Sequence, residues 1–545
     1  MTARVMASGS AVAPDALGVP LHKGSVAAAG AGFGPFPGAP AAGPATDEVS
    51  AKLDRGEFAP NTTSELRDAP GRRLLNLSLL PTGGVLFALD AAFVAILWPL
   101  LLWNAHAGVL PRLALPMDVR AILYPACDLL LLYAMGLYRR DALLHTGMSL
   151  SRVPLVVGMG AALTLLFSIT LGALDPALFL QPDGRDQMFE LAFASLCFTA
   201  TAYHARMLVK VMVRRQMLRR RLLVVGAGRR AWDLLHMLSK EGGNLSYDIA
   251  FLHHDVLGQT DSRLTDAPGA RVLRPATFAV LQAARKLGAD QIVIAPDERR
   301  GMDLEELLAC KTAGFPVVQY LSFVEQEIRR IDLKRMELGW LLFSDGFQFS
   351  AIDRFLKRVF DIVISSSLLV ATAPVTVAAM MAIRWEGAGP VLYRQERVTQ
   401  GGRVFRILKL RTMRTDSEAG GAVWAAQQDS RITKIGGFLR RTRIDELPQL
   451  VNVLCGEMSF VGPRPERPVF TVELARQIPL YNERHMVKAG LTGWAQVNYP
   501  YGASVDDARS KLSYDLYYVK NFSILFDLVI LLQTLRVVLW PSGVR

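Results

Sequence analysis

Residues 359–383 read VFDIVISSSLLVATAPVTVAAMMAI, an apolar run of 25 residues with Pro374 in its second half. A helix of this length can cross the ~30 Å hydrocarbon layer of a bilayer. Pro374 removes a main-chain hydrogen bond and can bend the helix sharply. Basic side chains flank both ends, so no charge asymmetry favours crossing. They are Arg354, Lys357, Arg358, Arg384, Arg394 and Arg397. We therefore predict a re-entrant membrane helix over residues 357–384; a spanning helix kinked by the proline is the alternative.

Four further apolar runs precede this one, at residues 84–103, 119–137, 153–174 and 191–213. Because each approaches the ~20 residues that span a bilayer, we predict a four-helix transmembrane region at residues 77–220. Its basic residues lie mainly on one side, which places both ends of the region in the cytoplasm. Asp90 and Asp128 fall in the first two runs, and we expect them to pair with side chains of neighbouring helices.

The composition agrees with a membrane protein. The chain has 545 residues, of which 51% are hydrophobic and 20% charged, and its 61 Lys and Arg against 49 Asp and Glu give a net charge of +12. The four cysteines show no disulfide or zinc pattern. The basic excess fits an anionic lipid surface or a phosphorylated substrate, and no motif indicates nucleic acid. Residues 1–76 have no secretory signal and are predicted to be a disordered cytoplasmic tail.

A small Rossmann-like α/β domain is predicted at residues 221–324, followed by a linker at residues 325–353. Strand-like stretches at 222–225, 249–252, 291–295 and 316–321 alternate with helical stretches, a pattern typical of a parallel sheet covered by helices. The glycines of Gly226-x-Gly228-x-x-Ala231, directly after the first strand, form half of a dinucleotide-binding fingerprint. We favour the alternative, in which the glycines only permit a tight turn in a structural or regulatory domain.

The most concentrated polar signal lies in the third predicted domain, residues 354–545, which ends in a predicted interfacial helix at residues 524–540. Lys409 and Arg411 would lie on one face of a strand, and R-R-T-R-I-D-E-L-P-Q follows at residues 440–449.

Within the latter stretch, the adjacent acids Asp445 and Glu446 beside many cations suit Mg²⁺-assisted phosphoryl transfer, with one carboxylate as nucleophile and the other at the metal. Alternatively, Asp445 caps a helix that has Glu446 and Pro448 in its first turn. The arginines taken alone are typical of a solvated face or a lipid-headgroup contact.

These motifs, in this order, resemble those of the bacterial sugar transferases, the monotopic phosphoglycosyltransferases that prime exopolysaccharide and O-antigen synthesis. The matching stretches are residues 357–361, 389–398, 405–413, 440–449, 461–465 and 491–497. The resemblance covers nearly all of residues 352–545, and the preceding regions match the large form of the family. It implies a membrane α-helical bundle, a Rossmann-like α/β domain and an α/β phosphoglycosyltransferase domain with a re-entrant helix.

The resemblance also implies a reaction: transfer of a sugar 1-phosphate from a UDP-sugar to polyprenyl (undecaprenyl) phosphate, giving polyprenyl diphosphate sugar and UMP. It makes Asp445 the nucleophile and Glu446 its companion at an Mg²⁺ site. Its phosphate-binding candidates are Lys409, Arg411, Arg441 and Arg464. It implies a multi-pass protein of the bacterial inner (cytoplasmic) membrane with a cytoplasmic catalytic domain. The sequence leaves open the sugar, the polyprenyl length and whether a homo-oligomer forms.

Two stretches depart from the family's pattern. The helix break reads Ala373-Pro374 rather than Ser-Pro, with Thr372 as a substitute for the serine. After Asn498 the chain continues YPYGAS at residues 499–504, which resembles a subgroup linked to exosortase-type exopolysaccharide systems.

Two other function classes compete with this one. A membrane-anchored, NAD-dependent sugar-nucleotide dehydratase or epimerase would use the glycines after the first strand, with Asp255 near the place of a ribose-binding acid. No Tyr-x-x-x-Lys pair is present to supply its usual catalytic base. A non-enzymatic scaffold of a polysaccharide assembly complex is the third reading, and it would have no need of the adjacent acids.

Overall fold

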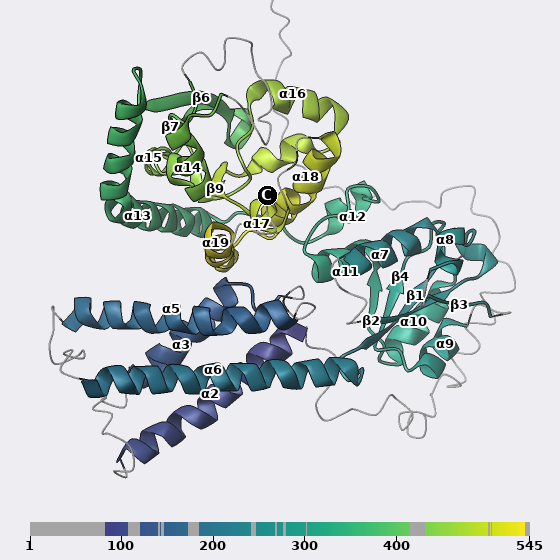
Figure 1. Cartoon of the computed structure of the whole chain (residues 1–545). Helices are drawn as coiled ribbons and strands as arrows, with labels where there is room; N and C mark the ends of the chain where they lie inside the picture. Colours follow the sequence, from purple (N-terminus) through teal and green to yellow (C-terminus); the bar gives the residue numbers. More distant parts are fainter. Residues whose placement is uncertain are drawn as a thin grey trace, which may run out of the picture. The chain divides into compact units, whose positions relative to one another are not determined.

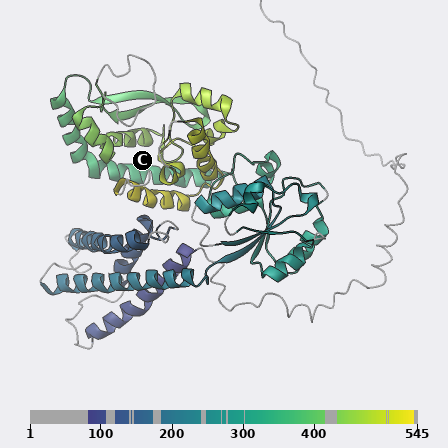
Figure 2. The same ribbon diagram turned by 45° about the vertical axis from the view of Figure 1, so that its right-hand side comes forward.

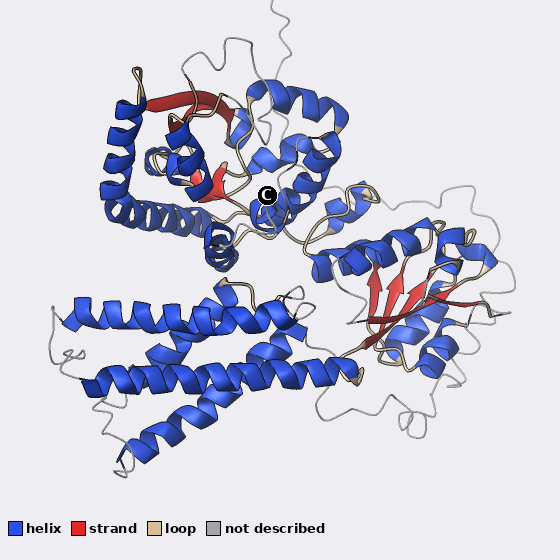
Figure 3. Ribbon diagram, viewed as in Figure 1, coloured by secondary structure: helices blue, strands red, loops and turns tan. Residues whose placement is uncertain are grey.

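The computed structural model describes residues 82–106, 120–139, 142, 146–172, 185–240, 247–267, 270–275, 279–300, 302–414, 431–499, 502 and 504–539. The predicted tail at residues 1–76 lies outside these ranges. The described residues are mostly helical, with a parallel sheet in the middle of the chain and smaller strand pairs nearer its C-terminal end (Figures 1 and 3).

Among the described residues, four helices precede the sheet and share one apolar core. They are α2 (Thr82–His106), α3 (Arg120–Ala134), α5 (Thr146–Gly172) and α6 (Arg185–Arg214). The core includes Leu86, Leu132, Val156 and Ala205, all of them fully buried. Of the described residues in this region, only Ser149–Leu166 forms a helical stretch long and apolar enough to cross a membrane, while α2 and α3 contain the shorter apolar stretches Gly83–Ile96 and Pro125–Ala134.

The prediction that Asp90 and Asp128 pair with side chains of neighbouring helices is confirmed for Asp90 only. Asp90 accepts hydrogen bonds from Arg206 at 3.1 Å and from the Tyr138 hydroxyl at 2.9 Å, and all three side chains are buried. Such pairing offsets part of the cost of placing a charge among apolar helices. Asp128 differs, because its buried Oδ1 has no hydrogen-bond partner among the described residues.

The sheet has five parallel strands in the order β3-β2-β1-β4-β5. Its strands are β1 (Arg220–Val225), β2 (Tyr247–Leu252), β3 (Arg271–Leu273), β4 (Gln291–Ile294) and β5 (Val317–Gln319). The prediction of a parallel α/β sheet is therefore confirmed. The helices after its strands are α7 (Arg229–Lys240), α8 (Ser262–Thr265), α9 (Val280–Leu287), α10 (Leu304–Thr312) and α11 (Tyr320–Ile328), with the short η4 (Asp255–Leu257).

Helices cover both faces of this sheet. One apolar core lies on the side of α7 and α11, and another lies on the side of α9 and α10 (Figures 1 and 2). The central strand β1 is consequently buried from both sides, and Leu222 to Val225 are all fully buried. This explains why its sequence is continuously apolar instead of alternating.

The C-terminal third combines one long helix with short elements. The helices are α12 (Leu338–Phe343), α13 (Ala351–Glu386), α14 (Lys434–Thr442), α15 (Gln449–Cys455), α16 (Pro468–Gln477), α17 (Trp494–Asn498), α18 (Val505–Lys520) and α19 (Ile524–Leu539), with the 3₁₀ helices η5 (Gln400–Gly402), η6 (Ile444–Glu446) and η7 (Tyr481–Met486). Strands β6 (Leu392–Val398) and β7 (Val404–Leu410) form an antiparallel hairpin, and β8 (Ser459–Val461) pairs with β9 (Gly490–Thr492) in parallel.

Helix α13 contains the predicted break and turns sharply partway along its length (Figures 1 and 3). It begins with a capping box between Ser350 and Asp353 and continues through Pro374. The Thr372 hydroxyl donates to the Leu368 carbonyl at 2.7 Å. A threonine hydroxyl that bonds to the preceding turn favours a bend, as the proline does, so Thr372 supplies the kind of hydrogen bond expected of the missing serine.

Helices α13 and α19 expose apolar side chains and bury polar ones, which is the opposite of what helices of a water-soluble protein do. Along α13, Phe355, Val370 and Trp385 are exposed whereas Lys357, Asp361 and Ser365 are buried. Along α19, Leu525 is 76% exposed and Asp527 is fully buried.

The buried polar groups of these two helices contact one another and strand β8. Lys357 Nζ donates to Asp527 Oδ2 at 2.6 Å and to the Val461 carbonyl at 3.1 Å. Asp361 Oδ1 accepts from Ser459 Oγ and from the Phe460 amide, both at 3.0 Å. The apolar sides of both helices are thereby left on the outside of this region.

Candidate active site

The adjacent acids Asp445 and Glu446 lie in η6, a single 3₁₀ turn between α14 and α15. Helix α14 ends at Thr442, and Arg443, its C-cap residue, adopts a left-handed conformation with φ of +61°. Helix α15 begins after Pro448, without a side-chain cap. The alternative interpretation of Asp445, as a helix cap, is therefore wrong. Its carboxylate does not cap the amides at the start of α15, although the Asp445 residue is only 7% exposed.

Glu446 is surrounded by cations. Its Oε1 lies 3.2 Å from Lys409 Nζ, 3.6 Å from a terminal nitrogen of Arg443 and 3.6 Å from a terminal nitrogen of Arg464. Burial disfavours the charged form, but the three cations outweigh burial and lower the pKa of Glu446 to about 2. Glu446 is consequently ionised at neutral pH and holds the three cationic side chains together.

The same surroundings shift the pKa of Asp445 in the opposite direction. Burial, followed by the neighbouring negative charge of Glu446, raises the pKa of Asp445, and Lys409, Arg443 and Arg440 only partly oppose this. Burial likewise lowers the pKa of Lys409, against the attraction of Glu446. Two adjacent carboxylates with pKa values shifted apart are the pattern expected where two acids have different roles.

Of the four predicted phosphate-binding residues, the structure brings Lys409 and Arg464 to the acid pair. Arg411 lies elsewhere: its guanidinium donates at 2.8 Å to the Ala388 and Gly387 carbonyls that follow the end of α13. Arg441 Nε bonds to the Gly437 carbonyl of its own helix. In both cases the guanidinium group is bound elsewhere and does not contact Glu446 through these bonds.

Two neighbouring cations were not among the predicted residues. Arg443 contacts Glu446 directly, and Arg440 donates from Nε to Thr412 Oγ1 at 2.9 Å while its charge acts on Asp445. Both belong to the stretch at residues 440–449, but its sequence does not reveal which arginine faces the acids. The structure shows that it is Arg443, whose main chain is left-handed.

Asp445 and Glu446 are the candidate ligands for the predicted Mg²⁺. This ion is usually held by one or two carboxylates together with substrate phosphates and water. Asp445 and Glu446 are adjacent, and the Asp445 carboxylate has no competing helix cap. Among the described residues, no group of three or more His, Cys, Asp or Glu side chains forms a more complete cage. Bound here, Mg²⁺ would neutralise phosphate charge beside the two acids.

The glycine-rich turn after β1 is arranged differently from a nucleotide-binding loop. Gly226 has φ of +112°, and a side chain at Gly228 would collide with the Asp297 carboxylate. That carboxylate accepts hydrogen bonds from the amides of Arg229 at 2.7 Å and Arg230 at 3.0 Å. The start of α7, where a dinucleotide would place its pyrophosphate, therefore already holds an anion supplied by the chain. This arrangement does not support the dehydratase or epimerase hypothesis.

Comparison with known proteins identifies the family of the chain. Residues 352–541 match the family model described as bacterial sugar transferase. Exopolysaccharide production protein PSS of Rhizobium leguminosarum bv. phaseoli is 41% identical over 192 residues, which cover 34% of this chain and 94% of that protein. The chain therefore belongs to the bacterial sugar transferase family.

Two relatives have names that state a reaction. The UDP-N-acetylgalactosamine-undecaprenyl-phosphate N-acetylgalactosaminephosphotransferase of Aeromonas hydrophila is 40% identical over 253 residues, covering 46% of this chain and 58% of the relative. The UDP-glucose:undecaprenyl-phosphate glucose-1-phosphate transferase of Escherichia coli K12 is 38% identical over 187 residues, covering 34% of this chain and 40% of the relative. The match thus spans about half the length of these two relatives.

Proposed function

We propose that the protein transfers a sugar 1-phosphate from a UDP-sugar to undecaprenyl phosphate, giving undecaprenyl diphosphate sugar and UMP, as the priming step of exopolysaccharide synthesis. The observation that carries this proposal is the buried acid pair with three cations around Glu446. The names of the relatives support the substrate classes. Because those relatives act on different UDP-sugars, the proposal covers the class and not one sugar.

In this proposal Asp445 is the nucleophile. Its carboxylate oxygen attacks the phosphorus that carries the sugar, the diphosphate bond breaks, and UMP leaves with the electron pair. An oxygen of undecaprenyl phosphate then attacks the same phosphorus and displaces Asp445. Lys409, Arg443 and Arg464 stabilise the phosphate charges, and Glu446 keeps these cations in place.

Substrate phosphates would change the balance of charge in the site. Without them, Glu446 is already ionised, whereas burial and the charge of Glu446 disfavour ionisation of Asp445. An Mg²⁺ ion on the two acids would favour the ionised form of Asp445, which the attack requires. Asp445 and Glu446 are the residues that would hold this ion.

We also propose how the chain meets the membrane. The exposed apolar sides of α13 and α19 would lie in lipid, with α13 entering and leaving on one face because of its bend and α19 lying in the interface. With α2, α3, α5 and α6 as spans, the protein would be a multi-pass protein of the bacterial inner membrane, with its catalytic region in the cytoplasm. The sheet of order 3-2-1-4-5 would be a Rossmann-like domain without a dinucleotide.

The nucleophile is tested by the variant Asp445→Asn, which preserves shape and removes the negative charge. We expect it to release UMP from a UDP-sugar at least about 1,000-fold more slowly than the wild type, because the covalent step is lost. The measurement is UMP formation by purified protein with undecaprenyl phosphate, Mg²⁺ and a panel of UDP-sugars. Asp506→Asn, at an exposed ion pair on α18, is the matched control and should keep full activity. Full turnover by Asp445→Asn would overturn the assignment.

A further inference from the structure

The loop formed by residues 462–467, with sequence GPRPER, carries Arg464 to Glu446. Two of its six residues are prolines, which cannot donate main-chain hydrogen bonds. Five of its carbonyls, those from Pro463 to Arg467, each accept a hydrogen bond. Main-chain amides of neighbouring segments account for three of them: the Gly490 amide donates to Pro463, the Val398 amide to Glu466 and the Thr471 amide to Arg467.

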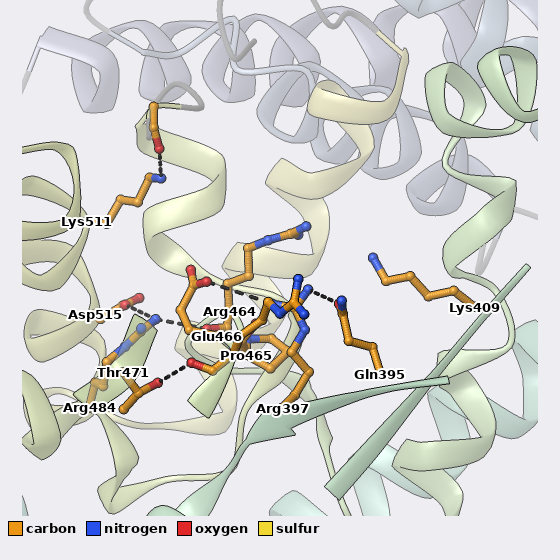
Figure 4. A network of polar contacts seen from close by, with 12 residues as sticks. Gln395, Arg397, Lys409, Arg464, Pro465, Glu466, Thr471, Arg484, Lys511 and Asp515 are labelled. Carbon is orange, nitrogen blue, oxygen red and sulfur yellow. Dashed lines mark hydrogen bonds and ion pairs between the residues drawn. The ribbon is translucent and has the colours of Figure 1, made fainter. Parts of the chain in front are cut away.

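The other two of these five carbonyls, those of Arg464 and Pro465 at the centre of the loop, are held by arginine side chains. Arg484 donates to the Arg464 carbonyl at 2.9 Å, and Arg397 donates to the Pro465 carbonyl at 3.1 Å (Figure 4). Arg484 comes from η7 and Arg397 from β6, so two separate elements hold adjacent peptide groups. With these bonds, every carbonyl from Pro463 to Arg467 has a partner.

Both arginines are themselves fixed. The Arg484 residue is 5% exposed, and its guanidinium bonds to Asp515 at 2.8 Å and to the Tyr481 hydroxyl at 2.8 Å. Arg397 donates to Gln395 Oε1 at 2.6 Å and lies 3.8 Å from the Glu466 carboxylate (Figure 4). A loop held by such groups loses little freedom when a ligand arrives, which favours binding.

We propose that Arg397 and Arg484 are positioning residues, which hold the main chain of the 462–467 loop so that the Arg464 guanidinium faces the acid pair before substrate binds. Their hydrogen bonds go to the loop and to its supports, and Arg464 is the group that reaches Glu446. This inference rests on the proposed function, in which Arg464 binds the diphosphate of the UDP-sugar. It predicts that both arginines act on substrate affinity through Arg464.

The test is a double-mutant cycle on the full-length protein with UDP as the probe. Arg484→Lys and Arg397→Lys keep the positive charge but cannot reproduce all of the original hydrogen bonds at once, and Arg464→Met removes the guanidinium. The dissociation constant of UDP is measured by calorimetry, and KM and kcat for UMP release are measured on the same proteins. We expect each lysine variant to weaken UDP binding about tenfold. This is the effect of losing one charge-assisted hydrogen bond, here the one between Arg464 and UDP.

The cycle separates positioning from a general structural role. In the Arg464→Met background, Arg484→Lys and Arg397→Lys should each change UDP affinity less than about twofold, since the group they position is gone. KM should rise more than kcat falls, because ground-state binding is affected. Arg358→Lys is the matched control: Arg358 also binds carbonyls, those of Val453 and Leu454 at the end of α15, and its replacement should lower the unfolding temperature without a tenfold change in UDP affinity.

The outcomes distinguish the two proposals. Equal losses with and without Arg464 would overturn the positioning role, even if UMP release is intact. If the wild type binds UDP and shows the predicted cycle but releases no UMP, the positioning role stands and the proposed reaction fails. Absence of UDP binding by the wild type overturns both. If one lysine variant does not fold, the other still completes a cycle.

Discussion

Arg443 has a left-handed main chain, and its guanidinium lies 3.6 Å from Glu446 Oε1. A non-glycine residue in this conformation costs roughly 1 kcal/mol, a cost that is retained where the surrounding structure or the function requires it. Half of the Arg443 side chain is exposed, whereas Lys409 is mostly buried. Arg443 is therefore well placed to meet an anion that arrives from solvent.

The first prediction concerns Arg443→Asn. Asparagine tolerates the left-handed conformation, so the fold should lose only the small stabilisation from one half-exposed ion pair with Glu446, while UDP affinity falls about tenfold with the loss of a charge-assisted contact. Arg441→Asn, two residues earlier, should change that affinity less than about twofold, because Arg441 bonds to its own helix. Calorimetric titration with UDP and thermal unfolding check both values. If Arg441→Asn weakened UDP binding more than Arg443→Asn did, the sequence-based assignment of Arg441 as a phosphate-binding residue would be supported instead.

Glu446 gives a second prediction at this scale, on pH. Its pKa falls from an ordinary value of 4.5 to about 2 in the folded protein, so its ionised form stabilises the fold above pH 4.5, and this contribution disappears as the pH falls toward 2. The shift corresponds to about 3 kcal/mol. We expect Glu446→Gln to unfold at a clearly lower temperature than the wild type at about pH 6, with the difference shrinking steadily toward about pH 2.5. Glu473→Gln, on the exposed side of α16, is the control. A difference that does not depend on pH would contradict the charge argument.

The sequence could predict Asp445, Glu446, Lys409 and Arg464 as one group because the motif order identifies a family. It could not predict which further cations join them. Lys409 and Arg411 share a face only if the strand continues, and β7 ends at Leu410, after which Arg411 turns to the end of α13. The helix-cap prediction for Asp445 failed for a related reason, since α14 and α15 are separated by a 3₁₀ turn that no residue pattern marks.

At the scale of elements, α13 and α19 expose apolar side chains and bury charges, which is the opposite of what water requires. Lys357 is the centre of the contact between them, with Asp527 at 2.6 Å and Asp361 at 3.4 Å. One ammonium group thus serves two buried carboxylates. Removing it would leave both without their counter-charge.

The third prediction follows from this arrangement. Lys357→Met should destabilise the detergent-solubilised protein by about 3 kcal/mol or more, because a buried ion pair is broken from one side. Lys357→Met combined with Asp527→Leu should recover part of that loss, since the uncompensated carboxylate is also removed. Thermal unfolding of the single and double variants measures the effect. Additive losses would show that the two groups do not act as a pair.

Sequence periodicity was most informative for the elements of the sheet. The stretches predicted at 222–225, 249–252 and 291–295 are β1, β2 and β4, because strands covered on both faces are continuously apolar. Strand β3, Arg271–Leu273, was missed. It is three residues long, lies at the edge of the sheet and is only partly buried, so its sequence has too little apolar pattern to be recognised.

For the whole molecule, the main question is the side of the membrane on which each region lies. The catalytic region follows α13, so a spanning α13 would place the acid pair opposite the predicted cytoplasmic end of α6. A bent α13 keeps both on one side. The bend, the proline and the Thr372 hydrogen bond favour the second arrangement. Access to UDP-sugars, which are made in the cytoplasm, would require it under the proposed function.

The fourth prediction compares single cysteines at the two ends of α13, in a variant whose four native cysteines are replaced by serine. Asp345→Cys precedes α13, and Arg403→Cys follows β6; both positions are exposed. In intact cells, neither should react with a thiol reagent that cannot cross the membrane, and both should react after the cells are opened. Ala177→Cys, outside the described residues and in a loop predicted to face the other side, should react in intact cells and shows that the reagent works. Labelling of Arg403→Cys but not Asp345→Cys in intact cells would show that α13 spans the membrane. The acid pair would then lie on the outer side, where the proposed reaction has no UDP-sugar.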